Sequence, residues 1–210
     1  MARPVILHRD FYSRDTPIVA RELLGKWLYS EIGGQLTAGV IVETEAYLAE
    51  EDPACHAAKG RTPGNAAMFE EPGWAYVYPI HSRCCFNVVT EAAGVGAAVL
   101  IRAIEPKLGL SLMRQRRAAR RGTETSSREL CSGPAKLCEA LGIGRDFNQH
   151  DLTKGKTLWL GEPFNGQDPG EHVPLEIRVT SRIGVTSAKD LPLRFVWAGH
   201  PSASGPRCLR

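Results

Sequence analysis

The order of the predicted secondary structure constrains the fold of this chain more than any other feature of its sequence. Helix-like and strand-like segments follow one another irregularly, whereas a doubly wound α/β protein alternates them. Extended segments are predicted at residues 35–47, 74–80, 84–90, 97–105, 156–160, 174–179 and 193–197. Helices are predicted from Asp15 or Thr16 towards the break at Gly33-Gly34, in the basic stretch after residue 105, and from Ser132-Gly133-Pro134 to Gly142. We therefore expect an α+β fold with a mostly antiparallel sheet.

The length and composition favour one domain. The chain has 210 residues, and 43% of them are hydrophobic, which is enough for a substantial core and excludes a disordered chain. No internal repeat or low-complexity linker divides it, so we expect residues 1–210 to form a single domain with a flexible tail over 198–210. The first helix is expected to bury a stripe of four side chains, Ile18, Val19, Leu23 and Leu24.

Membrane and metal-binding classes are excluded. No apolar run approaches the ~20 residues of a membrane helix, and charged residues interrupt the N-terminus before a signal peptide could form. The six cysteines include no Cys-x-x-Cys pair, so a zinc site lacks its usual spacing and reduced thiols are expected. We expect a protein of a bacterial-type cytoplasm that binds no metal.

Charge is distributed unevenly along the chain. Eight bases and two acids lie between Arg102 and Arg128, whereas seven acids and two bases lie between Glu43 and Glu71. The basic stretch reads as an amphipathic helix that turns Leu108, Leu112, Gln115 and Ala119 to one side. A solvated surface helix is the plain alternative, but the density of arginine favours contact with phosphate groups.

Residues with acid–base chemistry are concentrated near the end of the first predicted strand. Alternation along residues 43–47 places Glu43, Glu45 and Tyr47 on one face, with Thr44 and Ala46 on the other. An imidazole, further phenols and a guanidinium occur nearby in the predicted fold, at His56, at Tyr76 and Tyr78, and at Arg102. We expect these groups to converge, although the residue types alone do not choose between the two acids.

The sequence resembles the alkyladenine (3-methyladenine) DNA glycosylase family. The matching blocks are Ile41 to Tyr47, His56, Arg61 to Asn65, Met68-Phe69, Pro72-Gly73, Tyr76-Val77-Tyr78, Cys85-Phe86-Asn87, Leu100 to Pro106, Met113-Arg114, Glu129 to Pro134 and Lys136-Leu137. The resemblance covers about residues 10–197, including the C-terminal block 181–196. It implies a curved sheet flanked by helices, with a protruding hairpin.

The resemblance also implies an activity. Members of the family flip 3-methyladenine and related damaged purines out of duplex DNA and hydrolyse the glycosidic bond by direct attack of water, without a cofactor. The expected partner is double-stranded DNA, and the expected state is a monomer. A non-catalytic nucleic-acid-binding module is the alternative from another class. A helix-hairpin-helix glycosylase, suggested by Leu141 to Gly144, lacks the usual proline and the catalytic Lys/Asp arrangement.

The family's motifs assign roles to individual residues. Glu45 matches the general base, and Arg102 matches the residue that helps to hold the water. The positions that form the base pocket are Tyr47, His56 and Tyr78 for stacking, Asn87 at the floor and Val185 near the water. Asn87 would obstruct the exocyclic amine of a normal guanine.

Two further groups of residues are expected to contact the DNA outside the pocket. Relatives tend to place Tyr-Gly at the hairpin tip where this chain has His81, so His81 or Ile80 is the expected wedge. A helix start and cationic side chains suit phosphate groups, and the residues expected on the DNA backbone are Ser132, Gly133, Lys136, Arg114 and Arg117. Lys136 is assigned to the backbone and not to nucleophilic attack, so an intact abasic site is the expected product.

Overall fold

A single long strand, β2 (Gln35–Tyr47), organises the sheet in the computed structural model, which describes residues 4–121, 126–163 and 176–205. One edge of β2 pairs with β5 (Ala98–Leu108) along most of its length. The other edge pairs first with β1 (Trp27–Ile32) and then with β8 (Arg194–Trp197). All of these pairings are antiparallel, so the expected α+β class is confirmed.

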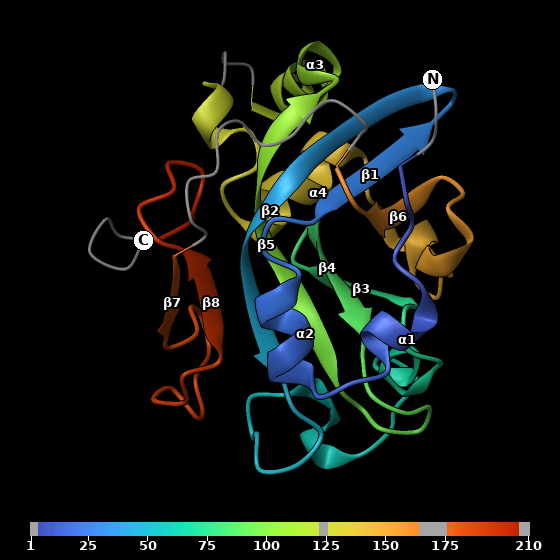
Figure 1. Cartoon of the computed structure of the whole chain (residues 1–210), viewed down its shortest axis with the longest axis vertical. Coiled ribbons are helices and arrows are strands. Elements are labelled where there is room, and N and C mark those ends of the chain that lie inside the picture. Colours follow the sequence, from blue (N-terminus) through green and yellow to red (C-terminus); the bar gives the residue numbers. More distant parts are fainter. Residues whose placement is uncertain (1–3, 122–125, 164–175, 206–210) are drawn as a thin grey trace.

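The sheet continues outward from these central strands (Figure 1). Its order is β3-β4-β5-β2-β1-β6, and β7 joins through β8 at one side. The remaining strands are β3 (Ala75–Ile80), β4 (Arg83–Val89), β6 (Leu158–Gly161) and β7 (Ile177–Thr180). Because β4 pairs with β5 only over its last three residues, the turn end of the β3–β4 hairpin extends beyond the sheet, as expected.

Four α-helices and five short 3₁₀ helices occur within the described residues. The α-helices are α1 (Arg9–Tyr12), α2 (Thr16–Glu22), α3 (Leu110–Arg121) and α4 (Pro134–Leu141). The 3₁₀ helices are η1 (His56–Lys59), η2 (Ala66–Phe69), η3 (Ser127–Glu129), η4 (Arg145–Phe147) and η5 (Leu152–Lys154). The Asp15 side chain caps α2 by accepting the Ile18 N–H, and α4 ends at Gly142 in the left-handed region with φ 72°.

The hydrophobic core lies mainly on one face of the sheet. Side chains of α2 and α4, such as Val19 and Leu137, share one buried cluster there with Val99 and Ile101 of β5. A smaller cluster that includes Met68, Tyr76, Val89 and Ala98 covers part of the other face. Strand alternation thus divides β5 between a core face and a second face that carries the residues of chemical interest.

A β-bulge in β2 decides which face its acids occupy. The register against β5 shifts around Ile41 and Glu43, which inserts one residue into the strand. Beyond the bulge, Thr44 turns to the helix side, where its hydroxyl donates to the Ala20 carbonyl at 2.7 Å, while the Tyr47 hydroxyl donates to Glu45 on the opposite side. The alternation predicted for residues 43–47 is confirmed.

Two predictions near the N-terminus are wrong. The segment before Gly33-Gly34 is not helical, because residues 27–32 form strand β1 and the two glycines, with φ of 59° and 74°, make the turn into β2. Ile18 is 48% exposed and does not share the buried stripe of α2, whereas Val19, Leu23 and Leu24 are buried. The apolar content of residues 27–32 alone did not distinguish a strand from the continuation of the helix.

The predicted orientation of the basic helix is also wrong. In α3 the buried side chains are Met113 and Arg117, one turn apart, whereas Gln115 and Ala119 are exposed. Arg117 pairs with Glu139 of α4, which also lies 3.3 Å from Arg83 of the hairpin. The carboxylate of Glu139 thus determines which face of α3 packs inward. The apolar pattern of the sequence did not indicate that face.

The C-terminal segment is packed against the sheet as far as residue 205. Ser202, Ala203 and Ser204 are buried, and the Ser204 N–H and hydroxyl both donate to the carboxylate of Glu43. The prediction of a flexible tail is therefore wrong for residues 198–205, because these hydrogen bonds fix the segment. Residues 206–210 lie outside the described part of the chain.

The described helices and side chains also bear on membrane crossing, metal binding and the state of the cysteines. None of the described helices is long and apolar enough to cross a membrane. Among the described residues, no group of three or more His, Cys, Asp or Glu side chains is placed to hold a metal ion. The five described cysteines are free thiols, and Cys208 lies outside the described residues.

Candidate active site

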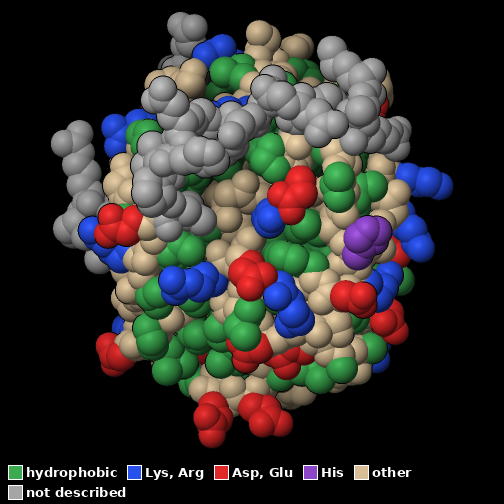
Figure 2. Space-filling view, viewed as in Figure 1, with side chains coloured by type: hydrophobic (Ala, Val, Ile, Leu, Met, Phe, Trp, Pro, Cys, Tyr) green, Lys and Arg blue, Asp and Glu red, His purple; other side chains and the backbone are tan. Residues whose placement is uncertain are grey.

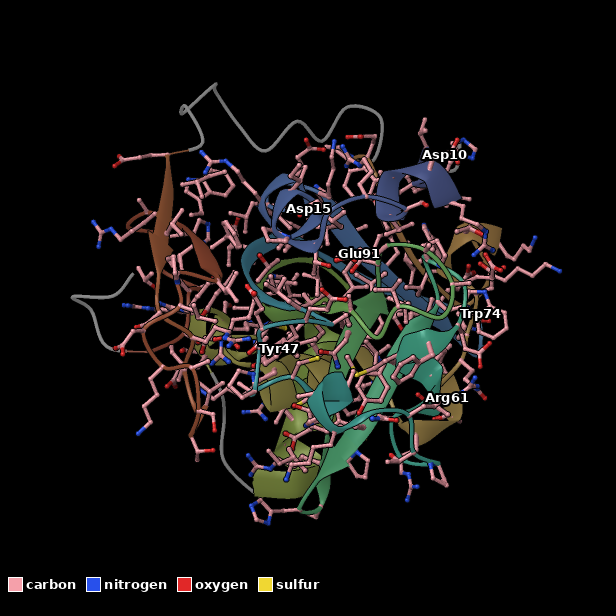
Figure 3. All side chains as sticks on the ribbon, turned by 90° about the horizontal axis from the view of Figure 1, so that it is seen from below. Asp10, Asp15, Tyr47, Arg61, Trp74 and Glu91 are labelled. Atoms are coloured by element: carbon pink, nitrogen blue, oxygen red, sulfur yellow. The ribbon has the colours of Figure 1, made fainter. Side chains whose placement is uncertain are left out.

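A pocket of about 640 Å³ opens on the second face of the sheet, at the end of β2. This volume lies within the range typical of small-ligand sites. The aromatic side chains that line it are Tyr47, His56, Tyr76 and Tyr78, and the segment 184–186 closes one side. Seen from below, Tyr47 lies well inside the outline of the molecule, while Asp10 and Arg61 lie nearer its edge (Figure 3).

The register of four strands places the key side chains in one row. Glu45 of β2 lies opposite Leu100 of β5, which lies opposite Asn87 of β4, which lies opposite Tyr76 of β3. Residues directly opposite each other in neighbouring strands point to the same face of a sheet. The fold thus brings Glu45, Asn87 and Tyr76 to the same face of the sheet.

Glu45 lies beneath the wall of the pocket. Its carboxylate is fully buried, and it accepts the Tyr47 hydroxyl at 2.9 Å and the Ile183 N–H at 2.7 Å. The Arg102 Nη1 lies 3.2 Å from Glu45 Oε2. A carboxylate offers about four acceptor positions, and three donors from the described residues contact this one. One acceptor position of the carboxylate thus has no donor among the described residues.

Glu43, the other acid of the motif, has a different environment. Its Oε1 accepts from the Arg102 Nε at 3.0 Å, the Arg194 Nε at 2.7 Å and the Ser204 hydroxyl at 2.9 Å. Its Oε2 accepts the Ser204 N–H at 2.6 Å. Four donors therefore hold the Glu43 carboxylate, three of them at one oxygen, and they link Glu43 to β5, β8 and the C-terminal segment.

Arg102 bridges the two acids. Its side chain is 8% exposed, and besides Glu43 and Glu45 it reaches the Ile183 carbonyl and the Ser204 hydroxyl, each at 3.4 Å. Burial opposes the charged guanidinium, but attraction to Glu45 and Glu43 outweighs it and raises the pKa of Arg102. Arg102 therefore stays cationic between the two carboxylates.

Tyr47 forms one wall of the pocket. Burial, and then the nearby charge of Glu45, raise the pKa of Tyr47 far above the ordinary value of a phenol. The hydroxyl therefore stays protonated and serves as a donor to Glu45. The ring plane is also held from behind, because the Arg182 guanidinium lies over it, 4.7 Å from the ring centroid.

His56 and two tyrosines form the opposite wall. The His56 Nδ1 lies 2.8 Å from the Tyr76 hydroxyl, and its ring meets that of Tyr78 edge-on with centroids 4.6 Å apart. Asn65 fixes the backbone of η1 by donating to the His56 carbonyl. Burial lowers the pKa of His56, so the imidazole is neutral near pH 7. The alternation of Tyr76 and Tyr78 indicated this aromatic face, but the pairing of His56 with Tyr76 was not predicted.

Asn87 and Val185 both line the pocket. Asn87 is buried on β4, and its side-chain amide donates to the Tyr76 carbonyl at 3.0 Å, which fixes its orientation. Val185 lies two residues after Ile183, the residue whose N–H donates to Glu45. The structure therefore brings these two predicted residues to the same cavity as the aromatic side chains.

The sequence reasoning missed a buried ion pair beside the site. The Arg182 guanidinium donates to both oxygens of Asp52, at 2.6 and 2.7 Å, and both side chains are fully buried. Burial opposes ionisation of Asp52, but the hydrogen bonds from Arg182 hold its pKa below the usual value. The Asp52-Pro53 turn was a visible signal, whereas its partner lies 130 residues away.

The hairpin tip carries the two predicted wedge residues. His81 occupies the turn between β3 and β4 with φ 52°, and it is exposed. Ile80 is 44% exposed, an unusual state for a large apolar side chain, and it also lines the rim of the pocket. An apolar side chain at the mouth of a cavity can insert between two neighbouring bases and contact both of them.

A second cavity of about 400 Å³ lies at the N-terminus of α4. Ser132 and Lys136 line it, with the Lys136 ammonium 3.4 Å from the Ser132 hydroxyl. Ser132 also bridges to Ala103, the neighbour of Arg102, so this cavity lies close to the active site. Gly133 is the N-cap of the helix, with φ 136°.

Two arginines of α3 differ in their suitability for DNA contact. Arg114 lies at the surface and donates to the Ser127 hydroxyl at 2.7 Å. Arg117 is fully buried against Glu139, so its assignment to the DNA backbone is wrong. The described part of the face with α2 carries acidic and basic side chains close together, not a basic patch (Figure 2).

Comparison with known proteins shows which family the chain is similar to. A model of the methylpurine-DNA glycosylase (MPG) family matches residues 10–201. A protein of Carboxydothermus hydrogenoformans assigned as a 3-methyladenine DNA glycosylase is 48% identical over 194 residues, which cover 91% of this chain and 94% of that protein. A DNA-3-methyladenine glycosylase of Homo sapiens is 41% identical over 206 residues, which cover 93% of this chain and 66% of the human protein.

The chain belongs to the methylpurine-DNA glycosylase family. The match spans most of the chain and includes every block on which the resemblance was based. The class predicted from the sequence, a DNA glycosylase, is confirmed.

Proposed function

We propose that the protein removes 3-methyladenine and related damaged purines from double-stranded DNA by hydrolysing the bond between base and deoxyribose. The observation that carries this proposal is the position of Glu45, a buried carboxylate that is held by Ile183 and Arg102 and is hydrogen-bonded to Tyr47, which lines the aromatic pocket. A purine inside a duplex is out of reach of such a carboxylate, so the nucleotide is flipped into the pocket at a cost of a few kcal/mol.

The pocket recognises the flipped base by stacking. The base lies between Tyr47 on one side and His56 with Tyr78 on the other, which are the walls of the cavity. A purine methylated at N3 or N7 is cationic, and an aromatic face attracts such a cation by ~0.5–2 kcal/mol. The neutral imidazole of His56 adds no repulsion. Asn87, held by the Tyr76 carbonyl, obstructs the exocyclic amine of an unmodified guanine.

Glu45 performs the chemistry with one water molecule. The remaining acceptor position of the carboxylate takes a proton from the water while the water oxygen bonds to the anomeric carbon. The glycosidic bond breaks at the same carbon, and its electron pair leaves with the purine, which neutralises a cationic base. The negative carboxylate also stabilises the positive charge that develops on the sugar. The products are a free base and an intact abasic site.

Lysine chemistry is the rival route to the same bond cleavage. Lys59 is the lysine among the described residues that line the pocket, and its side chain is exposed to solvent, whereas Glu45 is fully buried. Lys136 lies in the second cavity, where its ammonium suits a phosphate group. We therefore propose a monofunctional enzyme without a covalent imine intermediate.

DNA binding uses two places outside the pocket. Ile80 and His81 enter the space that the flipped base leaves, and Ile80 supplies most of the apolar contact. Ser132, Gly133 and Lys136 hold a phosphate at the N-terminus of α4, with Arg114 beside them. Because every proposed contact comes from one chain, the protein acts on its substrate as a monomer.

Analysis of the released products tests this proposal. Duplex DNA treated with a methylating agent is incubated with the protein, and the free bases are identified by mass spectrometry while strand breaks are measured with and without alkali. The expected result is free 3-methyladenine together with alkali-dependent breaks, and no protein–DNA adduct after treatment with borohydride. Breaks without alkali, or a borohydride-trapped adduct, would show lysine chemistry instead. Release of no base would contradict the proposal.

A further inference from the structure

The ion pair between Asp52 and Arg182 has no part in the reaction described above. Both side chains are fully buried, and the guanidinium makes a two-pronged contact with the carboxylate and a third hydrogen bond to the Ala46 carbonyl at 3.0 Å. Such pairs contribute little net stability, because the loss of hydration offsets their attraction and an apolar pair of similar volume does as well. Its position suggests another role.

The guanidinium lies behind the stacking wall of the pocket. It covers one face of the Tyr47 ring at 4.7 Å from the centroid, and Arg182 is fully buried and absent from the described lining of the pocket. The Tyr47 ring itself lines the pocket. The two faces of one ring therefore have different neighbours, with a fixed cation behind and the flipped base in front.

A cation behind an aromatic ring weakens the attraction of the ring for a second cation in front. The interaction arises from the negative faces of the ring, and the fixed guanidinium already draws on that charge. The two positive groups also repel each other at about 8 Å, and the Asp52 carboxylate that is bound to the guanidinium cancels part of this repulsion. A neutral base in the same place experiences none of this repulsion.

We infer that Arg182 is a specificity-determining residue that lowers the preference of the pocket for cationic over neutral damaged purines. The inference rests on the proposed function of the pocket. Asp52 holds the guanidinium at its place and moderates its charge. Arg182 also precedes Ile183, the N–H donor to Glu45, so substitutions here slow the release of every base to some degree. The diagnostic quantity is therefore the ratio of two rates and not either rate alone.

The test compares a cationic and a neutral lesion in the same duplex sequence, 7-methylguanine and hypoxanthine, under single-turnover conditions. The double variant Arg182→Gln/Asp52→Asn removes both charges, and the ratio of cationic to neutral release is expected to rise about threefold. Arg182→Lys keeps a positive charge and is expected to leave the ratio near that of the wild type. Asp52→Asn alone leaves the guanidinium uncompensated, so the ratio is expected to fall.

Controls separate this inference from the proposed function. The double variant Lys26→Gln/Glu162→Gln removes a surface ion pair at the opposite edge of the sheet and is expected to change neither rate. If the double variant at 182 and 52 does not fold, the direction of the change in Asp52→Asn decides the question. An unchanged or oppositely shifted ratio in variants that remain active would overturn the inference. Absence of any base release by the wild type would instead overturn the proposed function.

Discussion

Two glutamates on the same face of one strand differ because of their hydrogen-bond donors. Glu43 receives four donors from Arg102, Arg194 and Ser204, whereas Glu45 receives three and lies beneath the pocket. A saturated carboxylate holds segments together, and an incompletely occupied one can bind water. This difference assigns a structural role to Glu43 and a chemical role to Glu45.

The two acids should therefore differ in their effect on stability. Glu43→Gln removes the buried negative charge that Glu43 supplies to Arg102 and Arg194, and the expected loss is about 3–5 kcal/mol in the free energy of unfolding. Glu45→Gln keeps one acceptor oxygen for the Ile183 N–H, the Tyr47 hydroxyl can turn to accept from the new amide, and Arg102 retains Glu43, so this variant should cost less. Urea titration of both variants measures the difference. A larger loss for Glu45→Gln would show that the roles are reversed.

The neutral state of His56 sets an acidic limit to the release of cationic bases. Burial lowers the pKa of His56, so its imidazole becomes charged only at a pH below the ordinary value of about 6.5. The imidazolium would then repel a cationic base but not a neutral one. The ratio of 7-methylguanine to hypoxanthine release is thus expected to be constant from pH 8 to about 6.5 and to fall at lower pH. His56→Gln should abolish that fall, and a fall that persists in this variant would point to another group.

At the scale of single elements, α3 and the start of α4 separate surface charge from buried charge. Arg114 and Lys136 lie at the surface near the second cavity, while Arg117 of the same basic stretch is buried against Glu139. Counting charges along the sequence could not distinguish Arg114 from Arg117, because both belong to the same run of basic residues in α3.

Salt dependence of DNA binding tests this separation. Each phosphate contact contributes a slope of about −0.9 to the dependence of log K on log salt concentration. Arg114→Gln/Lys136→Gln should therefore reduce the slope by about 1.8, measured by fluorescence anisotropy with a lesion-containing duplex. Arg117→Gln should leave the slope unchanged and lower the stability of the protein. A reduced slope in a folded Arg117→Gln variant would contradict its buried placement.

The C-terminal segment depends on the ionisation of Glu43. Burial opposes the charge, but Arg102, Arg194 and Ser204 outweigh it and hold the pKa of Glu43 below its usual value. A carboxylate whose pKa is lower in the folded than in the unfolded chain stabilises the fold above the unfolded pKa of about 4.3. That stabilisation is lost as the pH falls through the lower, folded pKa.

Acid should therefore loosen this segment together with the global stability. Hydrogen exchange of the Ser204 N–H is expected to be slow from pH 7 to about 5, after correction for the intrinsic rate, and the unfolding free energy should decline below about pH 4. In Glu43→Gln the protection of the Ser204 N–H from exchange and the free energy of unfolding should both be lower at pH 7. Both should also depend less on pH in that range. An equal acid dependence in the wild type and the variant would assign it to other carboxylates.

At the scale of the whole molecule, the sequence predicted the α+β class, most strands and the residues that share a face within one strand. Local periodicity carries that information, as for Glu43, Glu45 and Tyr47. It did not predict strand β1, the burial of Arg117 or the packing of residues 198–205, because each depends on a partner from a distant segment. The pairing of Asp52 with Arg182 is of the same kind, and no spacing rule connects them.

The resemblance to a family supplied what local chemistry could not. It selected Glu45 over Glu43, and the number of donors around each carboxylate supports the same choice. The choice is difficult from sequence, because strand alternation places both acids on the same face of the long strand β2. The donors that distinguish them come from segments distant in sequence.

The rate of base release by Glu45→Gln, measured in a single turnover on a duplex with one 3-methyladenine, tests the central claim most directly. The amide keeps the size of the side chain, so the variant should bind the duplex as tightly as the wild type. It cannot accept a proton from water, and the rate should fall by at least a factor of about 100. Release at the rate of the wild type by a correctly folded variant would show that this carboxylate does not activate the water.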